Sequence, residues 1–365
     1  MSRREDEIQP RRSGRLGKVL RVVGSFVVVA ALFAFVLGST DDVGEVGDAI
    51  ASMTGVELAT LGLVALWNLG TYWMVVVAAT PGLTYPQAMV LVETTTAVSN
   101  AVPGGSAVAV GLTYGMLGSW GFSRSRSTIS VIVSGLWNNF AKLAMPVLAL
   151  ALLALQGDIG PGRITAAVFG IAALAGSVTV FALALRREEF ARKAGDVAAA
   201  WFSRVRAAVG KGPVEGWGQA TAKFRNRTIG LVSKAWLRLT VVTVISHVSL
   251  YVVLLVALRH IGVSNDEVNW AEVLAAFAFV RLLTAIPITP GGLGVVELGL
   301  VAGLTAAGGD EPQVVAAVLI YRALTYLLPI PLGVATYLFW RRNTSWRDSA
   351  PPPSPELAGA GSSPA

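Results

Sequence analysis

The chain has 365 residues, 54% of them hydrophobic and only 14% charged, with a formal net charge of +7, no cysteine and a mean hydropathy of +0.62. This composition excludes an ordinary soluble globular protein and indicates a polytopic membrane protein. The absence of cysteine excludes disulfides and thiolate metal sites. Most basic residues lie at the chain ends and in certain loops, a positive-inside pattern that argues against nucleic-acid binding.

The amino-terminal segment, residues 1–21, is basic and precedes an apolar run from Val22 to Leu37. A cleaved signal peptide carrying the pair Arg11-Arg12 is one interpretation. A retained first span with a cytoplasmic amino terminus is favoured, because no convincing A-x-A cleavage site follows the apolar run. Residues 39–55 contain acidic residues and no Lys or Arg, as expected of an outer loop.

A second span is predicted at Val56–Ala79, and an interrupted apolar segment follows at Pro86–Leu117. Two short arms of this segment flank Pro103, Gly104 and Gly105. Pro lacks a backbone donor and Gly tolerates positive φ, so this sequence breaks a helix. Irregular backbone at membrane depth is tolerated only inside protein or beside a watery cavity.

Four further spans are predicted at Thr128–Leu155, Ile164–Leu185, Ala235–Leu258 and Gln313–Trp340. Aromatic residues are interspersed among basic residues in the connector 186–234, which is typical of a cytoplasmic amphipathic helix on the anionic inner leaflet. A solvated connector is the alternative. The tail 341–365 is expected to be disordered and cytoplasmic.

A second interrupted segment runs from Arg281 to Leu304. When the two interrupted segments are aligned without gaps, Pro290, Gly291 and Gly292 match the earlier Pro-Gly-Gly sequence that begins at Pro103. Paired Gly/Pro-interrupted segments in two halves are a sequence pointer to a transporter's binding site. The alternative is a proline kink in an ordinary span.

The predicted fold class is therefore an all-α polytopic membrane protein with about six full spans and two re-entrant helical hairpins in an inverted repeat. Three spans separate the hairpins, so they enter from opposite sides. The membrane domain covers residues 22–340, and the charge pattern places both termini in the cytoplasm. Full double crossings, giving eight or more spans, leave the loops on the same sides, and only arm length separates the two topologies.

A few ionisable residues lie within the apolar segments, and each is costly when it faces lipid. They are Glu93, Lys142, His247, Arg281, Glu297 and Arg322. Arg281, Glu297 and Arg322 fall at similar depths near the middle of the membrane. Together they place two positive charges and one negative charge there. Helix amino termini after Gly105 and Gly292 also favour anions, so the expected ligand is a lipid phosphate. A buried structural ion network is the alternative.

Glu93, Lys142 and His247 are candidates for coupling. Glu93 is the only intramembrane acid near Lys142, and His247 belongs either to a proton path or to hydrogen-bonded packing. The sequence contains no HExxH, G-x-S-x-G or GxxxxGK[ST] motif, so neither a soluble catalytic constellation nor a cofactor is expected.

The motif PGGLGVVELG, the upstream Arg281, the downstream Tyr321-Arg322 and the earlier Pro-Gly-Gly resemble a flippase-like integral membrane family. This family is related to the transmembrane region of lysylphosphatidylglycerol synthase. The resemblance implies movement of phospholipids or polyprenyl-linked lipids between leaflets of a bacterial cell membrane. The full synthase has a soluble carboxyl-terminal aminoacyl-transfer domain, and this chain ends soon after its last predicted span, so it is not expected to be an enzyme.

Three functions remain open at this stage. The favoured one is translocation of an anionic phospholipid or polyprenyl-phosphate lipid through a site at Arg281, Glu297 and Arg322. The second is a non-transporting, lipid-binding partner of a glycosyltransferase or lipid synthase. The third, a membrane-embedded lipid enzyme, is disfavoured because acid/base groups are scarce.

Overall fold

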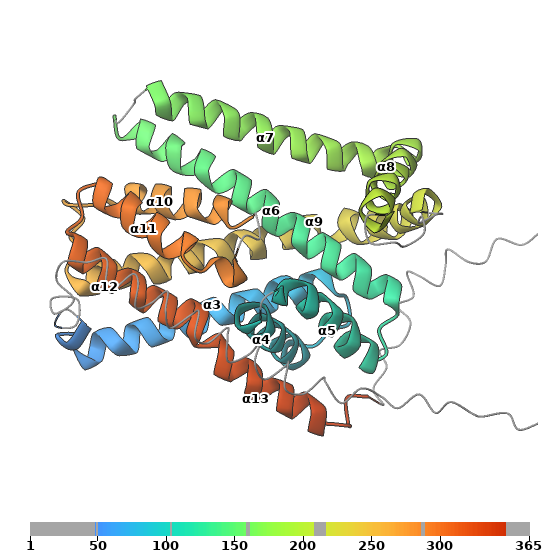
Figure 1. Ribbon diagram of the computed structural model, residues 1–365, viewed down its shortest axis with the longest axis horizontal. Helices are drawn as coiled ribbons and strands as arrows, with labels where there is room; N and C mark the ends of the chain where they lie inside the picture. Colours follow the sequence, from blue (N-terminus) through green and yellow to red (C-terminus); the bar gives the residue numbers. More distant parts are fainter. Residues whose placement is uncertain are drawn as a thin grey trace, which may run out of the picture.

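A computed structural model describes residues 48, 50–102, 104–157, 161–207, 217–285 and 289–347, and every regular element in these ranges is helical (Figure 1). The predicted first span Val22–Leu37, Pro103 and the tail beyond residue 347 lie outside the described residues. The described part of the chain confirms the all-helical class.

The described helices follow one another in a simple order. They are α3 (Gly55–Ala79), α4 (Tyr85–Ala101), α5 (Gly105–Ser119), α6 (Arg124–Leu155), α7 (Pro161–Arg186), α8 (Glu188–Ala207), α9 (Trp217–Ile261), α10 (Trp270–Leu283), the 3-10 turn η1 (Pro290–Gly292), α11 (Val295–Ala306), α12 (Glu311–Arg322), the π-helical turn η2 (Ala323–Leu327) and α13 (Pro329–Arg342).

Four of these helical stretches are long and apolar enough to cross a membrane: Gly55–Ala79, Arg124–Leu155, Thr228–Ile261 and Glu311–Arg342. They coincide with four of the predicted spans. The predicted span Ile164–Leu185 lies in α7, whose apolar stretch Val168–Leu183 is shorter. The predicted connector 186–234 contains α8 and the first turns of α9, which begins at Trp217.

Local sequence signals set several helix starts. Thr54 and Glu57 form a capping box at the start of α3, and Thr84 with Gln87 forms another at the start of α4. In each box the Thr hydroxyl accepts a backbone N–H of the first turn while the Glu or Gln side chain accepts the N–H of the capping residue, so two free donors are satisfied. Positive φ at Gly104 (+68°) lets the chain enter α5.

The helices α4 and α5 form one hairpin, and α10 and α11 form another (Figure 1). The α10–α11 pair packs closely because Gly299 lies against Val280 and Gly303 against Ala276. A Cβ on Gly299 would lie 2.8 Å from the Val280 side chain. This Gly-x-x-x-Gly spacing is typical of close helix contacts in membranes.

The two hairpins extend inward from opposite ends of the helix bundle (Figure 1). At one end Trp340 at the end of α13 donates to Ser119 at the end of α5. At the other end Tyr251 of α9 donates to the carbonyl of Trp270, the first residue of α10. The hairpin tips meet near the middle, where α4 contacts η1.

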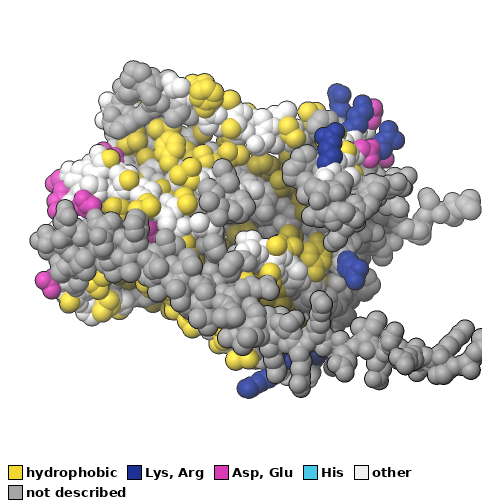
Figure 2. Space-filling model, in the orientation of Figure 1, with side chains coloured by type: hydrophobic (Ala, Val, Ile, Leu, Met, Phe, Trp, Pro, Cys, Tyr) yellow, Lys and Arg dark blue, Asp and Glu magenta, His cyan; other side chains and the backbone are white. Residues whose placement is uncertain are grey.

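Charged side chains separate between these two ends (Figure 2). The end that holds α8, here the basic end, carries Arg124, Arg126, Arg192, Lys193, Arg341 and Arg342, together with Glu188 and Glu189. The opposite end, here the acidic end, carries Asp48, Glu57, Asp266, Glu267, Asp310 and Glu311, with Arg259 and His260. This separation of charge agrees with the positive-inside pattern of the sequence.

Candidate functional site

A cavity of about 280 Å³ lies where the two hairpin tips meet. Both hairpins line it, together with α3, α6, α9, and the α12–η2–α13 stretch. Its charged lining residues are Glu93 of α4, Lys142 of α6, Arg281 of α10 and Arg322 of α12. The structure therefore brings four of the six intramembrane ionisable residues to one space.

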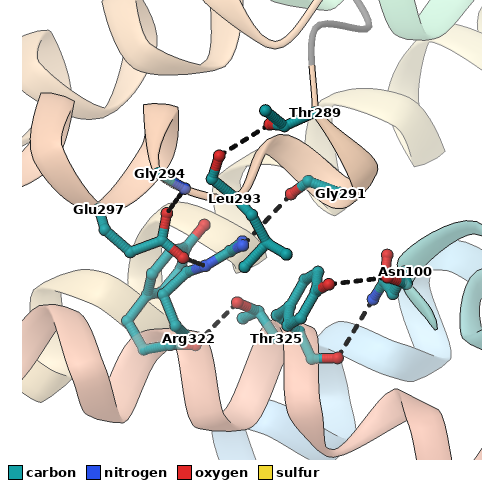
Figure 3. A network of polar contacts seen from close by, with 10 residues as sticks. Asn100, Thr289, Gly291, Leu293, Gly294, Glu297, Arg322 and Thr325 are labelled. Atoms are coloured by element: carbon teal, nitrogen blue, oxygen red, sulfur yellow. Dashed lines mark hydrogen bonds and ion pairs between the residues drawn. The ribbon is translucent and has the colours of Figure 1, made fainter. Parts of the chain in front are cut away.

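Glu297 and Arg322 form a buried ion pair behind the second hairpin tip (Figure 3). Arg322 Nε donates to Glu297 Oε1 at 2.7 Å, and the Gly294 N–H donates to Glu297 Oε2 at 2.8 Å. Arg322 Nη2 also donates to the Gly291 carbonyl at 3.3 Å. Glu297 thus neutralises Arg322 and occupies the positively polarised amino end of α11, so the pair fixes the shape of the tip.

Arg281 has no such counter-ion. Its side chain makes no hydrogen bond or ion pair with a described residue, and its Nε is buried without a partner. Lys142 is 8% exposed and makes one long contact, with its Nζ 3.5 Å from the Thr284 carbonyl oxygen. Two cations at the cavity are therefore free to bind a ligand.

Glu93 is the carboxylate of the cavity. Its Oε1 accepts the Trp73 indole N–H at 2.8 Å, whereas its Oε2 is buried and has no partner in the described part of the protein. Lys142, the partner expected for Glu93 from the sequence, lines the same cavity. The two side chains form no ion pair within 4.0 Å.

Glycines shape both hairpin tips. Gly291 (φ +58°) and Gly292 (φ +71°) line the cavity, whereas at the first tip the lining includes Ser106 but neither Gly104 nor Gly105. A Cβ on Gly291 would overlap the Tyr326 ring. Pro290 begins η1, and its side chain lies outside the described residues, as does Pro103.

A protein-family model described as "Lysylphosphatidylglycerol synthase TM region" matches residues 22–333 of the chain. The chain belongs to this family. It is also 28% identical over 110 residues to the phosphatidylglycerol lysyltransferase of Staphylococcus xylosus, a match that covers 29% of this chain and 13% of that protein. The family membership confirms the resemblance found in the sequence and identifies a membrane protein.

In this member of the lysylphosphatidylglycerol synthase TM region family, His247 lies outside the cavity lining. Its side chain is buried in α9, with Nδ1 3.0 Å from the Thr243 carbonyl oxygen and Nε2 without a partner among the described residues. The geometry supports hydrogen-bonded packing, and a part in a proton path stays a prediction.

The cavity also includes polar residues that sequence reasoning missed: Asn68, Tyr72, Asn100, Tyr321 and Tyr326. Asn68 and Tyr72 are four residues apart, so they share one face of α3, a spacing that was available as a signal. The Tyr72 hydroxyl makes no hydrogen bond to a described residue, so it is a potential donor to a ligand.

The charge balance of this family member favours an anionic ligand. Because Glu297 neutralises Arg322, the cavity keeps two cations, Lys142 and Arg281, against the single carboxylate Glu93. A planar guanidinium binds phosphate oxygens in pairs, and an ammonium adds a point charge. No cluster of three or more His, Cys, Asp or Glu residues that could hold a metal occurs within the described ranges.

Proposed function

We propose that the protein moves a lipid with a phosphate-containing headgroup between the two leaflets of a bacterial cell membrane. The observation that carries this proposal is the cavity between the hairpin tips, lined by Lys142 and Arg281, which have no counter-ion among the described residues. A buried cation without a counter-ion is costly. A bound phosphate offsets that cost, which makes these two residues the anion-binding pair.

The hairpins supply a route for alternating access. Their arms have 17, 15, 14 and 12 residues in α4, α5, α10 and α11. At about 1.5 Å per residue, none reaches across a hydrocarbon core of about 30 Å. We infer two re-entrant hairpins, one entering from each side, whose tips open the headgroup cavity to one leaflet at a time.

The substrate class follows from the site and the relative together. The relative is named for phosphatidylglycerol, an anionic phospholipid, so phosphatidylglycerol is the first lipid to test and a polyprenyl phosphate the second. We assign the cavity to transport and not to catalysis, because its charged groups arrange an anion-binding site and Arg322 is occupied by Glu297.

The test is leaflet exchange of fluorescent phosphatidylglycerol and polyprenyl phosphate in proteoliposomes. Arg281→Met and Lys142→Met should each slow exchange at least tenfold, because each removes a charge-assisted contact to phosphate. Arg342→Met, which removes an exposed arginine at the basic end, is the matched control and should exchange lipid at the wild-type rate.

Exchange that does not exceed that of empty vesicles, from protein shown to be folded, would overturn the transport proposal. If such protein still binds the lipid, the non-transporting role beside a glycosyltransferase or lipid synthase becomes the better account. Co-purification of that enzyme activity with the wild type, but not with Arg281→Met, would then support it.

A further inference from the structure

Glu93 is a buried carboxylate that the protein satisfies on one side only. The residue is 2% exposed, and Trp73 donates to Oε1, but Oε2 has no hydrogen-bond partner in the described part of the chain. A buried acceptor that lacks a donor costs about 1–3 kcal/mol, and more when it is charged. Because Glu93 lines the cavity, a ligand in the cavity can supply the missing donor.

The packing around Glu93 holds it in this state. The indole N–H of Trp73 is a donor only, so it fixes Oε1 and leaves Oε2 as a free acceptor. On the other side of α4, Gly333 of α13 lies so close to the Glu93 backbone that an added Cβ would overlap its carbonyl oxygen. The side chain is therefore placed before any ligand arrives.

The cations of the cavity do not take the free oxygen. Lys142 contacts the Thr284 carbonyl, and Arg322 is held by Glu297 and by the Gly291 carbonyl. Arg281 forms no ion pair with a described residue. The cavity thus offers two separate features to one ligand, a pair of cations and a carboxylate oxygen.

We propose that Glu93 is a specificity-determining residue that accepts a hydrogen bond from a donor group on the lipid headgroup. Lys142 and Arg281 hold the phosphate of the same headgroup, so this inference rests on the proposed function. The ligand class is a phosphodiester lipid that carries a hydroxyl or ammonium donor next to its phosphate. A phosphodiester without such a donor leaves Glu93 Oε2 without a partner and is discriminated against.

The variant Glu93→Gln gives this proposal a sharp test, because Trp73 dictates which way the amide turns. The indole N–H requires the amide oxygen on its side, which directs the amide NH₂ toward the position of Oε2. The substitution therefore replaces an acceptor by a donor in the same volume. A headgroup donor then meets another donor, and the preference for donor-bearing lipids is lost.

The experiment measures binding of short-chain lipids to the detergent-solubilised full chain by calorimetry. Dihexanoyl phosphatidylglycerol carries hydroxyl donors, dihexanoyl phosphatidylethanolamine carries an ammonium, and dihexanoyl phosphatidylmethanol carries neither. Wild type should bind at least one of the first two about tenfold more tightly than phosphatidylmethanol. The lipid with the larger preference identifies hydroxyl or ammonium as the donor.

Glu93→Gln should abolish this preference, so that its affinities for the three lipids lie within about threefold of one another. Glu311→Gln, an exposed change at the acidic end, is the matched control and should keep the wild-type ranking. Trp73→Phe is a second test, because it removes the bond that orients the carboxylate. It should reduce the preference without reversing it.

Equal wild-type affinity for the three lipids, or a wild-type ranking retained in Glu93→Gln, would overturn the inference. Absence of binding for all three lipids would overturn it as well. Leaflet exchange in proteoliposomes separates this failure from failure of the proposed function. Exchange without headgroup discrimination removes only the role of Glu93, whereas discrimination in binding without exchange removes only transport.

Discussion

Asn100 and Tyr326 are 226 positions apart in the sequence and bond to each other twice. The Asn100 side-chain Nδ2 donates to the Tyr326 carbonyl at 3.1 Å, and the Tyr326 hydroxyl donates to the Asn100 carbonyl at 2.7 Å (Figure 3). Asn100 lies at the tip of the first hairpin, and Tyr326 lies in the π-helical turn that follows Arg322. These two hydrogen bonds join the first hairpin to the α12–η2 stretch, which carries Arg322 of the buried ion pair.

The first prediction concerns this joint. Tyr326→Phe leaves the buried Asn100 carbonyl without its donor and should reduce stability by about 1 kcal/mol. Tyr337→Phe is the control, since the Tyr337 hydroxyl makes no hydrogen bond to a described residue of the protein. Thermal unfolding in detergent measures the difference, and equal melting temperatures for the two variants would contradict the role of the joint.

A second prediction follows from the glycine beside that tyrosine. Gly291 has φ +58°, and an added Cβ would overlap the Tyr326 ring. Gly291→Ala should therefore lower the melting temperature and slow lipid exchange. Gly111→Ala in α5 is the matched control, because a Cβ there meets no atom within 4 Å. Alanine is a better helix former than glycine, so the control should be neutral or slightly more stable.

The third prediction separates the two arginines of the cavity. Glu297→Gln removes the negative charge that pairs with the buried Arg322, so it should cost about 3–5 kcal/mol. Arg281 has no described counter-ion, so Arg281→Met should leave the melting temperature unchanged or raise it. Its defect should appear in binding of dihexanoyl phosphatidylglycerol, weakened at least tenfold.

Thermal unfolding and calorimetric binding on the same preparations test this contrast. Arg342→Met serves as the control for loss of an exposed positive charge. A fall in melting temperature as large for Arg281→Met as for Glu297→Gln would mean that Arg281 is part of the structural network, the alternative that the sequence left open.

The hydrophobic pattern predicted four of the spans because length and apolar content are local properties of the sequence. It also located the breaks at Pro290-Gly291-Gly292, since backbone chemistry alone interrupts a helix there. The assignment of Arg281 and Arg322 to one region was possible from residue counting, and the structure places both at the cavity.

The pairing of charges was not predictable in the same way. Nothing local in the sequence says that Glu297 binds Arg322 while Arg281 stays without a counter-ion, because that choice depends on how α10, α11 and α12 face one another. The position of Glu93 beside Trp73 likewise depends on the contact between α3 and α4. Tertiary packing thus decides which intramembrane charges hold the fold and which remain available to a ligand.

The last prediction tests the hairpins themselves in a chain that has no native cysteine. Ser125→Cys at the basic end should react with a membrane-impermeant maleimide only from the cytoplasmic side, and Glu311→Cys at the acidic end only from outside. Ser106→Cys, at the tip of the first hairpin and on the cavity, decides between the two topologies. A re-entrant hairpin keeps this tip within the membrane, so its labelling from outside should be much slower than that of Glu311→Cys. Equally fast labelling from outside would show that the first hairpin crosses the membrane twice, and it would contradict the proposal that two re-entrant tips open the cavity to one leaflet at a time.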